Sequence, residues 1–390
     1  MNPADNFAHK RSGLLSAFHY HTGQPVEVRW QNGIITSLEP STTTPTESLW
    51  IAPGLVDLQI NGFAGIDFQQ DELTAEELLT SVRGLRTSGC TQFFLTLVTD
   101  VWTRLLARVR RIRALRSECD ELRDAIAGWH IEGPFLSPEP GYCGAHNPAV
   151  MCDPALEKIR ELRSATENDP LLLTLAPERT GAFEAIALAV SLGMKVSLGH
   201  TNASRESLGQ AVQAGATGFT HLGNACPKEL DRHDNILWRV FETPGLLASL
   251  IPDKIHVSPP FFRLAHKLLG AASLCYTTDA MSAAGAPPGR YRLGALELEV
   301  GADQIVRQPG RTNFAGSALR PIDGVFRASE MLSQPWREVW DRSSTIPAKW
   351  IGLRHELQPG HDANFCLLRL KSSGQLDHLT VCWKGELITT

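Results

Sequence analysis

Between about residues 50 and 280, short apolar runs alternate with helix-like segments. The eight runs are WIAPGLVDLQI (50–60), TQFFLTLVT (91–99), AIAGWHIEG (125–133), LLLTLAP (171–177), MKVSLGH (194–200), TGFTHLG (217–223), KIHV (254–257) and SLCYTTDA (273–280). The intervening segments keep apolar residues near a 3.6-residue period, and one opens with a Thr74/Glu77 capping box. Eight strand-like runs separated by helical segments predict an α/β fold, a (β/α)8 barrel of the TIM type.

Both ends of the chain differ from this central region in their pattern of polar and apolar residues. Residues 12–39 alternate polar and apolar side chains around the turn signals TGQP and QNG, and residues 362–390 do so around SSGQ and KG. Neither piece is large enough to be stable alone. We therefore expect a small β domain assembled from residues 1–52 and 357–390, and a barrel domain over residues 53–356.

Composition narrows the functional classes. The chain has 390 residues, a formal net charge of −5 and a pI near 6.2, so it lacks the general basic field that attracts nucleic acid. It begins with no apolar signal-peptide core and contains no apolar stretch of about 18 residues that would indicate a membrane span. Its eight cysteines form no C-x-x-C pair, which favours free thiols in a reducing compartment. We expect a cytoplasmic protein that binds neither nucleic acid nor membranes.

Polar side chains close five of the eight apolar runs: Gln59 and Asn61 the first, Glu132 the third, His200 the fifth, His221 the sixth and Asp279 the eighth. In a β/α barrel the C-terminal ends of all strands meet at one rim, so these residues would converge in a single site. A lone histidine after a strand is more often a cap or a core residue. One Glu and two His at matching strand ends instead indicate a catalytic zinc site that leaves a position for water. Asp279 would then be free to move protons.

Seven stretches carry a family resemblance: PGLVDLQINGFAG, HIEGPFLSPE with GAHNP, LAPE, GHTNA, THLGNA, TTDAMSAAG and AGSAL. They occur in the order, and at about the separations, of the N-acetylglucosamine-6-phosphate deacetylases of the amidohydrolase superfamily. The chain resembles that family from Pro53 to the turn at residues 360–363. The resemblance implies a barrel with a small β-sandwich built from both termini, a homodimer, and hydrolysis of the N-acetyl group of an amino sugar 6-phosphate to acetate and amine.

The resemblance also implies roles for the strand-end residues. Glu132, His200 and His221 resemble the metal ligands, and Asp279 resembles the catalytic acid/base. Much of the superfamily has His-x-His on the first strand, whereas this chain has Gln59-Ile60-Asn61. Since an amide is a poor ligand beside an imidazole, the second metal position should be weak or vacant. We expect one divalent ion per chain, with Zn2+ as the first choice and Fe2+, Co2+ or Mn2+ as alternatives.

Further residues resemble the family's substrate-binding groups. His146, with Ala145 beside it, resembles the residue that hydrogen-bonds the substrate carbonyl. Asn224 and Ala225 of THLGNA resemble the segment that contacts the sugar phosphate.

Two cations resemble the family's phosphate-binding groups. They are Arg232 and His256, and the neighbouring His233 is an alternative to Arg232. The loop around Arg232 departs from the family pattern, with Gly223 and Cys226 where an aromatic residue and a methionine are common.

Two alternatives to this function remain open. An N-acetylgalactosamine 6-phosphate or another N-acyl amino sugar would keep the metal ligands and Asp279 and change only the pocket loops. A non-catalytic sugar-phosphate-binding protein would be expected to lack a ligand or the aspartate, and this chain lacks neither.

Overall fold

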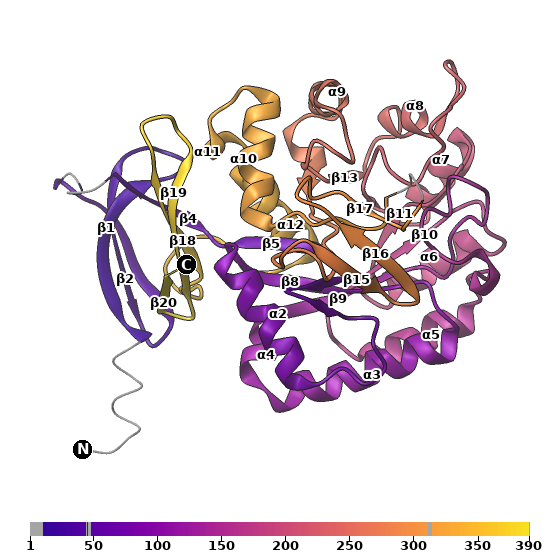
Figure 1. Ribbon diagram of the computed structural model, residues 1–390, viewed down its shortest axis with the longest axis horizontal. Coiled ribbons are helices and arrows are strands. Elements are labelled where there is room, and N and C mark those ends of the chain that lie inside the picture. Colours follow the sequence, from indigo (N-terminus) through magenta and orange to yellow (C-terminus); the bar gives the residue numbers. More distant parts are fainter. Residues whose placement is uncertain (1–10, 44, 46–47, 311–313, 390) are drawn as a thin grey trace.

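Eight parallel strands form the central sheet of the protein. The computed structural model describes residues 11–43, 45, 48–310 and 314–389. The strand order in the sheet is β14-β13-β12-β11-β10-β9-β8-β5, and an isolated parallel bridge between Ile60 and Ala280 joins its two edges. The predicted barrel is therefore confirmed (Figure 1). Its strands are β5 (Leu55–Ile60), β8 (Cys90–Val98), β9 (Ile126–Glu132), β10 (Leu171–Leu175), β11 (Lys195–Leu198), β12 (Gly218–Phe219), β13 (Leu247–Leu250) and β14 (Leu274–Tyr276).

Helices surround this sheet, and the strands inside it read as apolar runs because both of their faces are covered. Every residue of β5, β9 and β10 is buried. The predicted capping box is present at the start of α2, where Thr74 and Glu77 bond each other's backbone N–H. The helices are α2 (Ala75–Thr87), α3 (Trp102–Glu118), α4 (Asp120–Ala125), α5 (Leu156–Thr166), α6 (Ala182–Ser191), α7 (Arg205–Gln213), α8 (Ile236–Phe241), α9 (Pro259–Leu269), α10 (Pro321–Leu332), α11 (Trp336–Val339) and α12 (Thr345–Ile351), with short 3-10 turns η2 (Pro148–Val150), η3 (Ala271–Ser273) and η4 (Trp340–Ser343).

The seventh strand differs from the sequence prediction. KIHV (254–257) is a loop, and the strand is β13, Leu247–Leu250. Asp253 explains the difference, because its Oδ1 accepts the backbone N–H groups of Ile255 and His256, both at 2.8 Å, and so folds the segment into a turn. The first run also divides into two strands, since Leu49–Pro53 is strand β4 of a different sheet.

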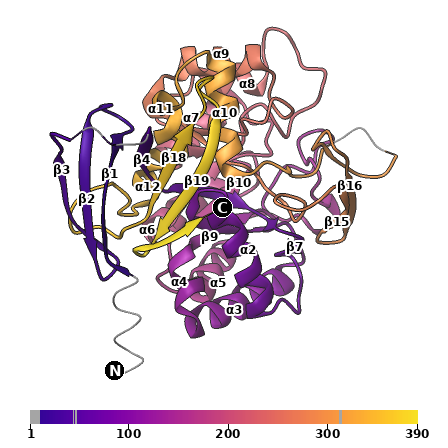
Figure 2. The ribbon, with the colours of Figure 1, turned by 60° about the vertical axis from the view of Figure 1, so that its left-hand side comes forward.

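Both chain ends build one seven-stranded sheet, in the order β20-β19-β18-β4-β1-β2-β3. Its strands are β1 (Gly13–His19), β2 (Pro25–Gln31), β3 (Ile34–Pro40), β4 (Leu49–Pro53), β18 (Phe365–Leu370), β19 (Leu376–Trp383) and β20 (Glu386–Thr389). The two halves share a core, in which the rings of Trp30 and Phe365 meet edge to face at 5.4 Å. The sheet thus fits the expected small β-sandwich, and Figure 2 shows the yellow C-terminal strands beside the indigo N-terminal ones.

A small antiparallel sheet follows β14 and precedes α10 in the sequence, and it was not predicted. Its strands are β15 (Gly289–Leu293), β16 (Leu296–Val300) and β17 (Val306–Arg307). A second short pair, β6 (Gly62–Phe63) and β7 (Ile66–Asp67), follows the first barrel strand. Asp67 joins the two insertions, because its Oδ2 accepts the backbone N–H of Gly294 at 2.7 Å.

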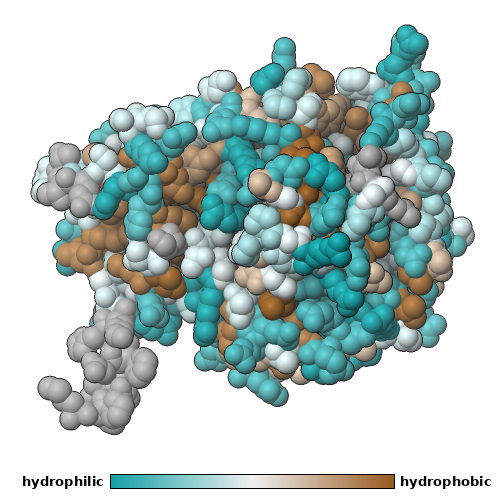
Figure 3. Space-filling model, viewed as in Figure 1, coloured by the Kyte–Doolittle hydropathy of each residue, from teal (hydrophilic) through white to brown (hydrophobic). Residues whose placement is uncertain are grey.

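The surface seen in Figure 3 is mainly hydrophilic over the barrel, while hydrophobic side chains gather over the small seven-stranded sheet at the left. Among the described residues, no helix combines the length and the apolar character that crossing a membrane requires.

Candidate active site

Three buried side chains from different barrel strands converge at one rim of the sheet. Glu132 is the last residue of β9, and His200 and His221 each follow the end of a strand by two residues. The Nε2 atoms of the two histidines lie 3.1 Å apart, and Glu132 Oε1 lies 2.9 Å from His221 Nε2 and 3.3 Å from His200 Nε2. Within the described part of the chain, this is the one cluster of three potential ligands that could hold a metal ion.

The chemistry of this cluster fits a divalent cation. The carbonyl oxygen of Tyr142 lies 2.9 Å from His200 Nδ1. Because that oxygen can only accept, Nδ1 carries the proton and Nε2 presents its lone pair to the site. Burial alone would raise the pKa of the Glu132 carboxyl, but the imidazole rings of His200, His221 and His146 around it hold its pKa well below the usual range. An ionised carboxylate and imidazole nitrogens at this spacing suit zinc-class ions.

The backbone at these positions is unusual. His200, His221 and Asp279 all have positive φ, at 50°, 34° and 51°. Non-glycine residues rarely adopt this left-handed conformation, and its strain persists only where surrounding structure enforces it. Such strain clusters at functional sites, so three instances around one cluster support a functional role.

Asp279 lies beside the cluster and accepts hydrogen bonds from two side-chain amides, one of which also bonds Glu132. Gln59 Nε2 donates to Glu132 Oε1 and to Asp279 Oδ1, both at 3.0 Å, and Asn61 Nδ2 donates to the same Asp279 oxygen at 2.7 Å. The amides therefore present N–H groups, not lone pairs, towards the carboxylates. Burial, followed by the negative charge of Glu132, raises the pKa of Asp279 to about 7.

His146 stands against the same cluster as a neutral imidazole. Its Nε2 lies 3.8 Å from Glu132 Oε2, and its ring packs edge to face on His200 with 4.4 Å between centroids. Its Nδ1 lies 2.8 Å from the hydroxyl of Thr99. Burial, and then the neighbouring His200 ring, lower the pKa of His146 to about 3. The ring is therefore uncharged near neutral pH.

Two of the residues expected to bind the sugar follow His221 in the chain, and a third lines a cleft beside His146. Asn224 follows His221 closely, and its backbone N–H and side-chain amide both donate to the His221 carbonyl oxygen, at 3.0 and 3.2 Å. Ala225 comes next, with a positive φ of 50°. Ala145 lines the cleft beside His146.

The two expected phosphate-binding cations lie in different surroundings. The His256 side chain is 8% exposed, and its Nδ1 lies 2.6 Å from Asp253 Oδ2. Its electrostatic effect on Asp279 lowers the pKa of that carboxyl, against the larger raising effect of burial. Arg232 and His233 lie in the exposed loop before α8. Within the described residues, no hydrogen bond or ion pair joins their side chains to the three-residue cluster.

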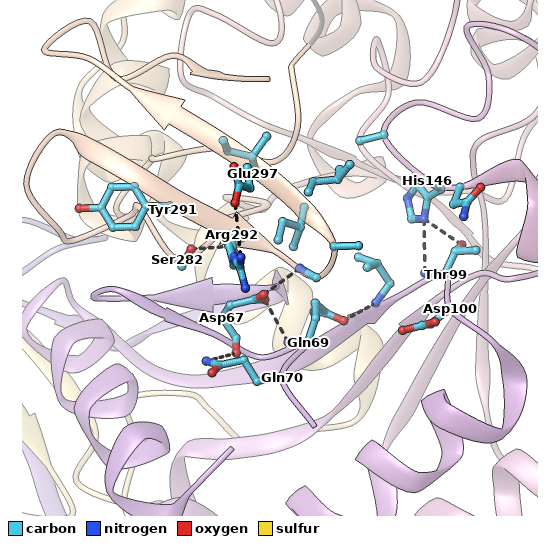
Figure 4. A pocket seen from close by; sticks show the side chains of 18 of the residues that line it. Asp67, Gln69, Gln70, Thr99, Asp100, His146, Ser282, Tyr291, Arg292 and Glu297 are labelled. Atoms are coloured by element: carbon cyan, nitrogen blue, oxygen red, sulfur yellow. Dashed lines mark hydrogen bonds and ion pairs between the residues drawn. The ribbon is translucent and has the colours of Figure 1, made fainter. Parts of the chain in front are cut away.

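A cleft of about 1560 Å³ opens beside His146. Figure 4 shows His146 and Thr99 at one end of this cleft and Tyr291, Arg292 and Glu297 of the β15–β16 hairpin at the other. Sequence reasoning missed both Thr99 and this hairpin. Thr99 does close the second apolar run, so the strand-end rule that found Glu132 would also have found it.

The chain is similar in sequence to known deacetylases. The chain is 30% identical over 334 residues to an N-acetylglucosamine-6-phosphate deacetylase of Vibrio furnissii, spanning 84% of this chain and 82% of that protein. It is 32% identical over 339 residues to the deacetylase of the same name from Danio rerio, spanning 83% and 81%. No protein-family model matches the chain.

Solved structures give the same picture. A variant of the Mycobacterium smegmatis N-acetyl-D-glucosamine-6-phosphate deacetylase, in complex with N-acetyl-D-glucosamine-6-phosphate, superimposes with a TM-score of 0.87 at 29% identity, covering 97% of this chain and all (100%) of that one. The enzyme from Pasteurella multocida shares the fold, with a TM-score of 0.85 at 24% identity over 97% of this chain and 100% of that one.

Proposed function

This chain belongs to the N-acetylglucosamine-6-phosphate deacetylase family, and from that premise we propose how its own residues perform the reaction. The enzyme is a hydrolase that cleaves the N-acetyl group of N-acetylglucosamine 6-phosphate, yielding glucosamine 6-phosphate and acetate. The observation that carries the proposal is the convergence of Glu132, His200 and His221 beside Asp279 at the rim of the barrel.

We propose Glu132, His200 and His221 as the ligands of one divalent cation, most plainly Zn2+ for a set of two imidazoles and one carboxylate. Such a cation, when bound, lowers the pKa of a coordinated water and polarises a carbonyl oxygen. Gln59 and Asn61 stand where a second cation would need ligands, and their N–H groups point at carboxylate oxygens instead. One ion per chain is therefore proposed.

Asp279 is the proposed carrier of the proton. Both amide N–H groups bind its Oδ1, which orients the carboxyl and leaves Oδ2 to exchange protons. Asp279 takes a proton from the attacking water as that water adds to the amide carbon. It then delivers this proton to the leaving nitrogen as the C–N bond breaks. Burial and the negative charge of Glu132 raise the pKa of Asp279 above the usual range of a carboxyl, which suits a group that must both accept and release a proton.

His146 is the proposed donor to the acetyl oxygen. A neutral imidazole can donate one N–H, and its position between Thr99 and Glu132 directs Nε2 into the site. A hydrogen bond to an oxygen that becomes negative in the transition state strengthens as the reaction proceeds. The deeply lowered pKa matters here, because an imidazolium beside the cation ligands would repel the bound ion.

The sugar phosphate is proposed to lie along Ala145, Asn224 and Ala225, with Arg232 and His256 as phosphate donors and His233 as the alternative to Arg232. A protein of net charge −5 needs local donors for a dianion. Asp253 supports His256 in this role, because its Oδ2 lies 2.6 Å from His256 Nδ1 and fixes the orientation of the imidazole ring.

The oligomeric state, the location in the cell and the domain boundaries are also proposals. We propose a homodimer in the cytoplasm, and a division of the chain into a small β domain (1–52 plus 357–390) and a barrel (53–356). The end of β4 at Pro53 and the start of β18 at Phe365 support that division.

The test of function is a side-by-side deacetylation assay. Purified enzyme is supplied with N-acetylglucosamine 6-phosphate and N-acetylgalactosamine 6-phosphate, and acetate and free amine are quantified. The proposal expects equimolar acetate and glucosamine 6-phosphate, with a higher kcat/KM for the gluco epimer. A preference for the galacto epimer would identify N-acetylgalactosamine 6-phosphate as the substrate. Absence of acetate from both reactions would overturn the proposed deacetylation.

A further inference from the structure

Asp57 is a buried carboxylate that the reaction itself does not use. It lies in the middle of β5 and is 4% exposed. Its Oδ1 accepts the backbone N–H of Gln59 at 3.0 Å and the hydroxyl of Thr277 at 2.5 Å. Its Oδ2 accepts both the backbone N–H and the hydroxyl of Thr278, at 2.9 and 2.7 Å. Four donors thus compensate the burial of one carboxylate.

These contacts cross the seam of the barrel. The sheet ladder runs from β14 round to β5, and between those first and last strands the backbone pairing is a single bridge, Ile60 to Ala280. Asp57 therefore joins the strands where backbone pairing is weakest. Its threonine partners are the two residues immediately before Asp279.

Asp279 itself sits in an enforced backbone conformation. Its φ is 51°, in the left-handed region that aspartate seldom adopts. Thr278 Oγ1 accepts the N–H of Ala280 at 3.2 Å, and the carbonyl oxygen of Asp279 accepts the N–H of Ser317 at 2.9 Å. Ser317 Oγ donates to the Thr278 carbonyl oxygen at 2.5 Å. The peptide units on both sides of Asp279 are therefore held by side chains.

From this arrangement we propose that Asp57 is a positioning residue: through Thr278 it fixes the backbone of Asp279 and so aims its carboxyl at the reacting atoms. The inference rests on the proposed role of Asp279. The hydrogen bonds of Asp57 to Thr277 and Thr278 could also stabilise the barrel without affecting catalysis. A positioning role differs from this stabilising role in one respect, because positioning matters only while Asp279 carries out the proton transfer.

The experiment uses Thr278, whose hydroxyl can be removed with little change in shape. Thr278→Val deletes the hydroxyl's bonds to Asp57 and to the Ala280 N–H and keeps the branched side chain. Thr278→Ser is the matched control that keeps the hydroxyl. Each is made in the full-length, metal-loaded enzyme and in the Asp279→Asn background. Measurements are kcat, KM, bound metal and melting temperature, with enough enzyme to follow the residual turnover of Asp279→Asn above the blank.

Positioning predicts that Thr278→Val lowers kcat by about 10- to 100-fold, with KM and metal content within about twofold of wild type. Thr278→Ser should retain kcat within about threefold. In the Asp279→Asn background Thr278→Val should have an effect below about twofold, because the two changes remove one function. Asp57→Asn should repeat the pattern of Thr278→Val, and it serves if the valine variant does not fold.

The inference is overturned if Thr278→Val keeps wild-type kcat, or if it lowers turnover by the same factor in both backgrounds. An equal loss of turnover in the two backgrounds would mean that the hydrogen bonds of Asp57 act through stability. Near-normal turnover by Asp279→Asn alone would instead refute the proposed base, which is a separate result.

Discussion

The side-chain amide of Gln59 donates a 3.0 Å hydrogen bond to Oδ1 of Asp279. The same nitrogen lies 3.0 Å from Glu132 Oε1, so one neutral amide links the two carboxylates at the place where a second cation would neutralise them. Because this N–H group offers no lone pair, we expect the site to bind one ion strongly.

Metal content should reflect this arrangement. Elemental analysis of the purified protein should find about one divalent ion per chain after mild chelation, and stronger chelation should abolish deacetylation until one equivalent is restored. Two ions that both resist mild chelation would show that the amides do not exclude the second position.

The pH dependence of activity should follow Asp279. Only the ionised carboxyl can take the water proton, and burial together with Glu132 raises its pKa to about 7. As a result, kcat/KM should rise with pH through an acid limb and level off once Asp279 is ionised. Since a cation on Glu132 favours the ionised form, the midpoint should lie below 7 in the metal-loaded enzyme. A profile that is flat from pH 5 to 8 would contradict this assignment.

Replacing His146 should lower turnover and leave the metal in place. His146→Phe keeps a ring against His200 but removes the N–H, so kcat should fall by roughly 10²–10³, the usual loss for one donor to a developing oxyanion. Metal analysis and the melting temperature are the controls. A loss of bound metal in this variant would identify His146 as a ligand instead.

The phosphate should be recognised by Arg232 and His256. Arg232→Ala should raise KM for the phosphorylated sugar well above its effect on unphosphorylated N-acetylglucosamine, and Arg232→Lys should recover only part of the loss, since lysine lacks the planar two-pronged donor. Arg110→Ala, an exposed arginine on α3, is the matched control. Equal losses on both sugars would place the phosphate elsewhere.

The barrel and the cluster were predictable because they follow from one geometric rule. In parallel strands wrapped into a barrel, the C-terminal ends share a rim. The four residues Glu132, His200, His221 and Asp279 therefore had to approach one another, although the first and the last are 147 positions apart. The rule needs only the ends of apolar runs, which periodicity identifies well.

Other features depend on contacts that a linear pattern does not contain. The run KIHV looked like a strand, but the Asp253 carboxylate captures two of its N–H groups and turns it into a loop. The β15–β16 hairpin interrupts the strand–helix alternation. Its residues alternate polar and apolar around Gly294, but this local pattern does not reveal that the hairpin lines the cleft. Asp57 lies within an apolar run, and its partner Thr277 is 220 residues away in sequence, so its role emerges only after the barrel closes.

Proton transfer by Asp279 is the central step of the proposed mechanism, and Asp279→Asn tests this step most directly. Asparagine keeps the size and one acceptor oxygen but cannot take a proton, and it leaves the three proposed ligands intact. Steady-state turnover and bound metal should be measured on the same preparation. We predict a fall in kcat of about 10²–10⁴, the range of general acid–base catalysis, with one ion still bound and substrate affinity little changed. Near-normal kcat, or loss of the metal from this variant, would contradict the account.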